Sequence, residues 1–162
     1  MKLYLKQKVF SWGDKFHLYD ENGETCYTVE GEVFTLGKKL HVYDVLENEA
    51  AYIHQEVWSF LPRFYIERPD GDKYEVIKEF TFLRPCYTVS GLNWTVEGDF
   101  WAHDYNVIEN GRVVVDVSKV WFTWGDLYEI NIDDSVDEVT ALCVVLVIDA
   151  VLAQEAAAAA AR

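Results

Sequence analysis

Three lysines near the N-terminus are the residues whose type and spacing most directly indicate contact with a ligand. Lys2, Lys6 and Lys8 occupy even positions of a stretch whose odd positions are mainly apolar. Residues of equal parity share one face of a β-strand, so these ammonium groups can converge, and Lys15 on the next predicted strand can extend the group. Anion or lipid contact would follow, because a lysine beside an anionic membrane contributes about 1 kcal/mol. The competing interpretation is an ordinary solvated strand face.

The histidines give a second set of candidates. His17, His41, His54 and His103 fall on separate predicted strands, and their spacing is not that of the HxH or HxxxH pairs that bind metals. One interpretation of His103 followed by Asp104 is a histidine base oriented by a carboxylate. The other is a polar turn between strands. We therefore assign no catalytic residue, no metal ligand and no cofactor from the sequence.

Two carboxylate pairs, Asp133-Asp134 and Asp137-Glu138, could indicate calcium binding or acid and base catalysis. Helix capping accounts for both pairs, because they fall where a helix is predicted to begin. The sequence also lacks the glycine-rich motifs of nucleotide-binding proteins and the GxSxG motif of hydrolases.

Net charge and cysteine content limit the classes of partner. The chain of 162 residues carries a formal net charge of −14, which opposes binding to nucleic acid. Cys26, Cys86 and Cys143 show no CxxC spacing, so we predict reduced thiols in a reducing compartment. Residues 1–8 interleave lysines with apolar residues and lack the continuous apolar stretch of a secretory signal. These features predict a cytoplasmic protein without a transmembrane segment.

Short alternating segments dominate the rest of the chain. Apolar and polar residues alternate in about a dozen stretches, and Asn-Gly or Asp-Gly pairs such as Asn22-Gly23, Asp70-Gly71 and Asn110-Gly111 separate several of them. This pattern is typical of antiparallel strands joined by tight turns. It predicts a barrel or sandwich within a single domain covering residues 1–162.

One helix is predicted to end the fold. Ser135 and Glu138 have the spacing of a capping box, which places the helix start near Val136 and predicts a helix over 136–154. Residues 139–153 are apolar on nearly every face, so a soluble chain must enclose this helix. We expect it inside the barrel, followed by the Ala-rich residues 155–162 as a tail that is compatible with a helix but can fray.

Aromatic segments recur along the chain. Residues 9–16, 57–64 and 120–128 each combine an aromatic-rich strand, a tight turn and a second strand, and two of them contain Trp-Gly-Asp, at 12–14 and 124–126. Three copies are too few for a solenoid or propeller, so we interpret them as parts of one barrel. The Trp-Gly-Asp turns could form an aromatic platform for a ligand, but their repetition favours an architectural role.

The chain resembles the LURP-one-related family, in particular its short bacterial members. The resemblance rests on residues 6–14, 96–105 and 121–126 and on the apolar segment 141–153, in this order along the chain. It implies a tubby-like fold, in which a twelve-stranded antiparallel barrel surrounds a hydrophobic C-terminal helix. It also implies kinship with phospholipid scramblases and tubby domains, but it identifies no catalytic residue, because a fold alone does not fix chemistry.

Three functional hypotheses follow. The first is a non-enzymatic intracellular binding or scaffold module. The second is a peripheral lipid-binding protein that uses Lys2, Lys6 and Lys8 or a rim of the barrel. The third is an enzyme whose site forms only on folding, with His103 and Asp104 as the residues to mutate first.

Overall fold

A computed structural model describes residues 1–7, 15–120 and 126–162 of the chain. Twelve strands and one helix lie in these residues: β1 Lys2–Gln7, β2 Lys15–Tyr19, β3 Thr25–Gly31, β4 Lys39–Tyr43, β5 Glu49–Gln55, β6 Arg63–Glu67, β7 Lys73–Thr81, β8 Arg84–Ser90, β9 Trp94–Asp99, β10 Asp104–Glu109, β11 Arg112–Val120, β12 Asp126–Ile132 and α1 Glu138–Ala160.

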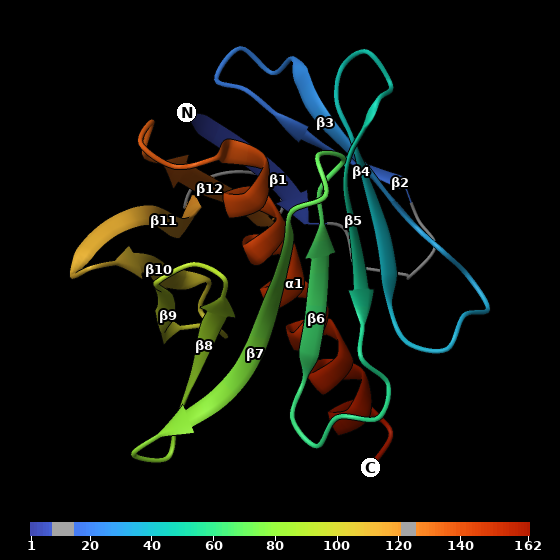
Figure 1. Cartoon of the computed structure of the whole chain (residues 1–162), viewed down its shortest axis with the longest axis vertical. Coiled ribbons are helices and arrows are strands. Elements are labelled where there is room, and N and C mark those ends of the chain that lie inside the picture. The colour runs from blue at the N-terminus through green and yellow to red at the C-terminus, as the bar shows by residue number, and fades with distance from the viewer. Residues whose placement is uncertain (8–14, 121–125) are drawn as a thin grey trace.

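The strands form a closed antiparallel barrel in which each strand pairs with its neighbours in the sequence (Figure 1). Pairing of β1 with β12, from Lys2 opposite Asn131 to Gln7 opposite Asp126, closes the ring. The alternation of the sequence produces this arrangement, since inward residues such as Leu40 and Val42 are buried while their neighbours on β4 face outward. The fold expected from the sequence is confirmed.

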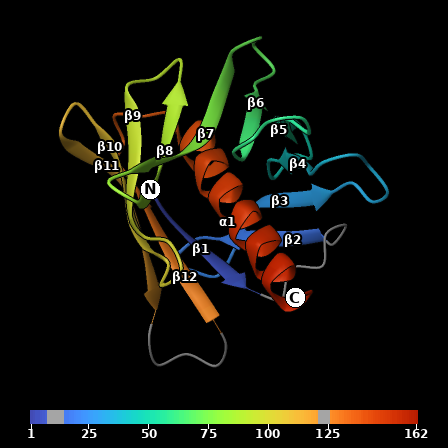
Figure 2. The ribbon, with the colours of Figure 1, turned by 90° about the horizontal axis from the view of Figure 1, so that it is seen from below.

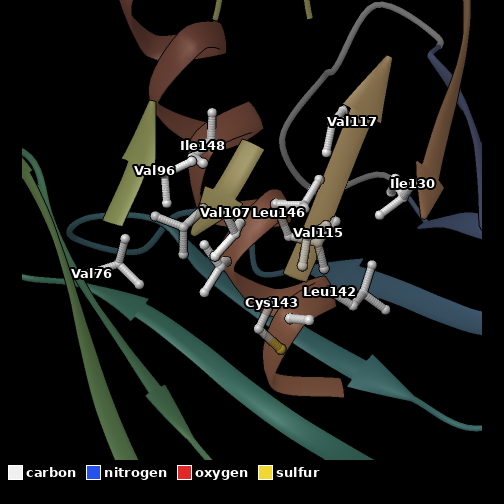
Figure 3. Close-up of a cluster of buried hydrophobic side chains, with 14 of the residues drawn as sticks. Val76, Val96, Val107, Val115, Val117, Ile130, Leu142, Cys143, Leu146 and Ile148 are labelled. Carbon is white, nitrogen blue, oxygen red and sulfur yellow. The ribbon is translucent and has the colours of Figure 1, made fainter. Parts of the chain in front are cut away.

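Helix α1 crosses the middle of the ring of strands, as the view from below shows (Figure 2). Its first half packs aliphatic side chains against inward residues of the barrel (Figure 3). Leu142, Cys143, Leu146 and Ile148 are all buried there. Burial of an aliphatic side chain of this size contributes about 1.5–3 kcal/mol, so this contact holds barrel and helix together.

The capping box predicted at the start of α1 is wrong. Asp137 is the N-cap, and its Oδ2 accepts a hydrogen bond of 2.7 Å from the backbone N–H of Thr140. Ser135 instead donates to Asp133, and Glu138 accepts a hydrogen bond of 2.6 Å from the Tyr27 hydroxyl. Asp137, and not the predicted Ser135, is the N-cap, because a carboxylate is as good a cap for a helix as a hydroxyl.

Helix α1 also runs from Glu138 to Ala160 rather than over 136–154. The Ala-rich tail, predicted to be compatible with a helix, is helical as far as Ala160, because alanine has the highest intrinsic helix propensity. The helix is long and apolar enough to cross a membrane, but 67% of its most apolar window is buried inside the barrel. Its aliphatic side chains are therefore covered by strands.

Sequential antiparallel pairing sends alternate connections to opposite ends of the barrel. The rim is the end formed by the connections 32–38, 56–62, 82–83 and 100–103, together with the C-terminal part of α1. In Figure 1 the C-terminus, the β5–β6 connection and the β7–β8 turn all lie at the bottom. The acidic end is formed by the connections 20–24, 44–48, 68–72, 91–93, 110–111 and 133–137.

Candidate functional site

Large apolar side chains project into solvent from the rim. Phe34, Phe60, Phe82 and Leu83 keep at least 95% of their surface exposed, and Trp58 keeps 91%. Further exposed apolar residues lie beside them: Val33, Leu36, Val57, Phe80 and Trp101. Single exposed apolar residues are ordinary on protein surfaces, but apolar residues gathered at one end indicate an interaction site.

Several of these residues also have an unfavourable backbone conformation. Phe82 and Leu83 form the two-residue turn between β7 and β8 with φ of 49° and 66°, and Phe34 has φ of 59°. Positive φ costs roughly 1–2 kcal/mol per residue outside glycine, because Cβ approaches the following carbonyl oxygen. The chain therefore retains bulky apolar residues where glycine or asparagine would fold more easily, which is typical of functional positions.

Hydrogen bonds hold the rim connections in place. The Lys38 backbone N–H donates to Gln55 Oε1 at 3.1 Å, and the Gln55 N–H donates to the Lys38 carbonyl at 2.9 Å. The Gln55 side chain also exchanges hydrogen bonds with Gln154 of α1, the shorter of 2.8 Å. The β3–β4 connection is thus joined to β5 and to the helix, and it presents Phe34 from a fixed base.

Charge is distributed unequally between the two ends. The described rim connections carry the formal charges of Glu32, Lys38 and Glu56. The acidic end takes its name from the carboxylates of its connections, namely Asp20, Glu21, Glu24, Asp44, Glu47, Asp70, Asp72, Asp133, Asp134 and Asp137. Most of the net negative charge of the connections therefore lies away from the rim.

A polar cluster occupies the rim half of the barrel interior. His103 Nε2 lies 3.6 Å from Asp149 Oδ1 of α1, and the imidazole stacks on Tyr128 with ring centroids 4.1 Å apart. Asp149 is buried, and burial raises its pKa to about 7. The buried hydroxyls of Tyr87 and Tyr105 make no hydrogen bond within the described residues, and burial followed by nearby carboxylates raises the pKa of both phenols.

This cluster changes the interpretation of the predicted His103-Asp104 pair. Asp104 is exposed at the start of β10, opposite Asp99 on β9. The carboxylate near His103 belongs to Asp149, far along the sequence. The closed barrel and its enclosed helix bring Asp149 to the β9–β10 connection.

His41 and His54 form part of an aromatic row on the outer surface. The ring centroid of Tyr52 lies 4.8 Å from that of His41 and 5.1 Å from that of His54, and both pairs are stacked; Tyr65 lies 5.3 Å from His54 with its ring tilted. His41 pairs with Tyr52 and His54 with Tyr65 across neighbouring strands, so the row stabilises the sheet. His17 lies apart on β2, within 3.0 Å of the Thr28 hydroxyl. Within the described residues, no cluster of three histidines, cysteines or carboxylates could hold a metal ion.

Two of the four predicted lysines lie beside carboxylates. Lys2 lies 3.5 Å from Glu129 and 3.6 Å from Glu21, and Lys15 lies 3.0 Å from Glu30. Lys6 is exposed, whereas Lys8 lies outside the described residues. Anion contact by these lysines stays a prediction. The Trp-Gly-Asp turns also lie outside the described residues, apart from the backbone of Asp126.

Sequence reasoning missed most of the rim. Residues 57–64 were interpreted as an architectural repeat, and Phe82-Leu83 drew no attention. The available signal was the placement of Trp58, Phe60, Phe82 and Leu83 between strands, where turns usually carry Gly, Asn, Asp or Ser.

Comparison with known proteins identifies the family. The model of the LURP-one-related family matches residues 1–149. The uncharacterized protein YxjI of Bacillus subtilis (strain 168) is 36% identical over 152 residues, which cover 94% of each chain. A protein from Arabidopsis thaliana with a known X-ray structure has a similar fold, with a TM-score of 0.64, 17% sequence identity and coverage of 93% of this chain and 91% of that chain. The chain therefore belongs to the LURP-one-related family.

Proposed function

We propose that this protein is a peripheral membrane-binding module that attaches to a lipid bilayer through the rim. The observation that carries the proposal is the projection of Phe34, Trp58, Phe60, Phe82 and Leu83 from three separate connections at one end of the barrel. A partner that covers all of them must be broad and apolar below its surface. A bilayer meets both requirements, and Trp in particular favours its interface.

The charge distribution supports the same orientation. A net charge of −14 would repel the chain from an anionic surface if it were spread evenly. With the rim seated on the bilayer, the carboxylates of the acidic end point toward water, beyond the Debye length of about 8 Å at physiological salt. Binding should therefore depend on apolar insertion more than on lipid charge.

The expected affinity suits reversible attachment. Complete burial of a Phe or Leu side chain contributes about 1.5–3 kcal/mol. Five such side chains supply a total similar to the roughly 4–15 kcal/mol that association costs in lost motion. The protein should therefore partition between water and membrane instead of inserting permanently.

The polar cluster gives only indirect support for binding, rather than catalysis, as the primary activity. Asp149 is buried within the barrel, whereas Phe34, Phe60 and Phe82 are exposed at the rim. We therefore propose a binding module and assign no reaction to it.

Vesicle flotation tests the proposal. Wild-type protein should float with phosphatidylcholine vesicles, and a variant with Trp58→Ser, Phe60→Ser, Phe82→Asn and Leu83→Gly should partition at least about 100-fold less, because it loses four inserted side chains. Val45→Ser with Leu46→Ser is the matched control, since these residues are also exposed and apolar but lie at the acidic end. Urea unfolding of all three proteins checks that each is folded.

The outcomes separate the hypotheses. Flotation lost in the rim variant and kept in the control supports the proposal. Absence of flotation with every vesicle composition overturns it and leaves a protein-binding scaffold. Salt-sensitive flotation that is lost on changing Lys2, Lys6 and Lys8 to Glu, but kept in the rim variant, overturns it in favour of the lysine group.

A further inference from the structure

The hairpin formed by β7 and β8 extends beyond the strands on either side of it. Pairing of β6 with β7 reaches only Ile77, and pairing of β8 with β9 reaches only Tyr87. Beyond these positions β7 and β8 pair with each other alone among the described strands, as far as Thr81 opposite Arg84. We call residues 79–86 the arm. Figure 1 shows its turn pointing away from the rest of the barrel, and three paired positions make the arm roughly 10 Å long before the turn.

The arm is exposed to solvent and apolar at its tip. Residues 79–84 are all exposed, and the two turn residues keep at least 95% of their surface accessible. Phe80, two positions before the end of the turn, adds a third exposed apolar side chain. The charged residues of the arm are Glu79 and Arg84, whose formal charges cancel. The arm therefore offers bulky apolar side chains and no net charge.

Contacts at the base hold the arm in a fixed direction. Lys78 is buried and forms an ion pair with Glu155 of α1, and its backbone N–H donates to the Pro62 carbonyl at 2.9 Å. Within the arm, the Thr81 hydroxyl and the Cys86 thiol lie 3.3 Å apart across the two strands. An arm that is ordered before it binds loses little conformational entropy when it inserts.

The neighbouring rim connections form a broader surface, which we call the platform. A Cβ at Gly37 would lie 3.0 Å from Cγ2 of Val57, so the β3–β4 connection packs tightly on the β5–β6 connection. The side chain of Gln55 joins both to Gln154 of α1. The platform therefore meets a bilayer over a continuous area, whereas the arm meets it at one point.

A narrow, stiff arm without net charge responds to how the lipids are packed. Neighbouring strands lie about 4.8 Å apart, so the arm is a wedge only two strands wide. Its insertion must part lipid headgroups, and electrostatic attraction does not offset this cost. The cost is lowest where the headgroups already leave hydrocarbon accessible, as in strongly curved bilayers.

We propose that the rim recognises bilayers with loosely packed headgroups, and that the arm is the wedge that enters between them. The inference rests on the proposed membrane attachment and names the class of membrane that the rim selects. This class comprises strongly curved bilayers and bilayers with bulky acyl chains, whatever the charge of their headgroups.

Vesicle size provides the first test. Wild-type protein should partition about tenfold more strongly into phosphatidylcholine vesicles of about 30 nm diameter than into vesicles of about 200 nm, at equal accessible lipid. Phe82→Asn with Leu83→Gly should reduce this ratio to less than about twofold, because Asn-Gly keeps the turn and removes the apolar tip. Urea unfolding checks that the variant is folded.

A second double variant is the matched control. Trp58→Ser with Phe60→Ser also removes two exposed apolar side chains, but it removes them from the platform. It should weaken partition into small and large vesicles alike and keep the ratio between them.

Acyl-chain structure separates lipid packing from vesicle shape. Large vesicles of phosphatidylcholine with methyl-branched chains keep the same headgroup and the same low curvature but pack less tightly. Wild-type protein should bind them about as strongly as it binds small vesicles, within about twofold. Binding that follows vesicle size and ignores chain branching would overturn the assignment to lipid packing.

Failure of this inference differs from failure of the proposed function. If wild-type protein partitions equally into small and large vesicles, the packing preference is wrong and membrane attachment stands. If the arm variant keeps the ratio, or both double variants lower it equally, the arm is not the wedge. If wild-type protein floats with no vesicles, both proposals fall.

Discussion

Two turns of the barrel have the same geometry and opposite chemistry. At the acidic end, Asn110-Gly111 joins β10 to β11, with φ of 50° and 80°. At the rim, Phe82-Leu83 joins β7 to β8, with φ of 49° and 66°. Asparagine and glycine are the usual residues for a two-residue turn with positive φ, whereas phenylalanine and leucine are unfavourable there.

The difference indicates that folding and binding set different requirements at the two ends. The turn at the acidic end satisfies the backbone, while the turn at the rim accepts strain and exposes two large apolar side chains. The interior also differs along α1: aliphatic residues surround its first part, while His103, Tyr87 and Tyr105 lie near Asp149 further along.

Leu142→Ala should give the largest change in stability. Leu142 is fully buried in the aliphatic half, so its truncation removes apolar contacts and leaves a cavity. We expect the free energy of unfolding to fall by about 2–5 kcal/mol in urea titrations, with partition into vesicles unchanged below the transition. A cost under about 1 kcal/mol would show that the aliphatic half does not dominate stability.

Asp149→Asn should give a smaller effect that depends on pH. Burial raises the pKa of folded Asp149 to about 7, above the ordinary value of 3.8, so the folded chain binds more protons than the unfolded chain between about pH 4 and 7. The free energy of unfolding of wild type should therefore fall across this window and level off above it. The variant lacks this titration, so it should gain about 4 kcal/mol relative to wild type between pH 4 and 8.

Urea unfolding at several pH values measures this gain. His103→Gln, which removes the nearby imidazole and keeps Asp149, should retain the fall of stability attributed to the carboxylate. Parallel pH profiles for wild type and Asp149→Asn would show that Asp149 is charged throughout, contrary to its buried position.

Exchanging the two turns tests the comparison directly. Phe82→Asn with Leu83→Gly should raise the free energy of unfolding by about 1 kcal/mol, because both residues then accept positive φ, and should weaken vesicle partition at least about tenfold. Asn110→Phe with Gly111→Leu should lower the free energy of unfolding by about 2 kcal/mol and leave partition unchanged. Thermal unfolding and flotation of the same samples measure both quantities. If the first variant loses stability, Phe82 and Leu83 serve the fold rather than a partner.

Salt should have the smallest effect. The described rim connections carry few charges, so raising salt from 50 to 200 mM should change partition into phosphatidylcholine vesicles less than about twofold. Flotation at the two salt concentrations measures this. A fall of tenfold or more would mean that charged groups, such as the predicted Lys2, Lys6 and Lys8, dominate attachment.

The sequence by itself determined the short antiparallel strands and the enclosed helix, while the family resemblance favoured a barrel over a sandwich. Alternation at Leu40 and Val42, turn pairs such as Asn110-Gly111, and the apolar faces of residues 139–153 act over a few neighbouring positions, so they can be interpreted without the fold. The exact cap was less predictable, because Ser135 and Asp137 are both good N-cap residues, and Ser135 is engaged by the neighbouring Asp133 and by Arg112 of β11.

Only the tertiary structure decided where the candidate sites lie. Phe34, Trp58 and Phe82 are far apart in the sequence, and the antiparallel order of the closed barrel places their connections at one end. The same closure brings His103 to Asp149 rather than to Asp104. Local sequence patterns cannot predict these contacts. The contacts depend on which strand closes the barrel and on how far α1 extends along the barrel axis.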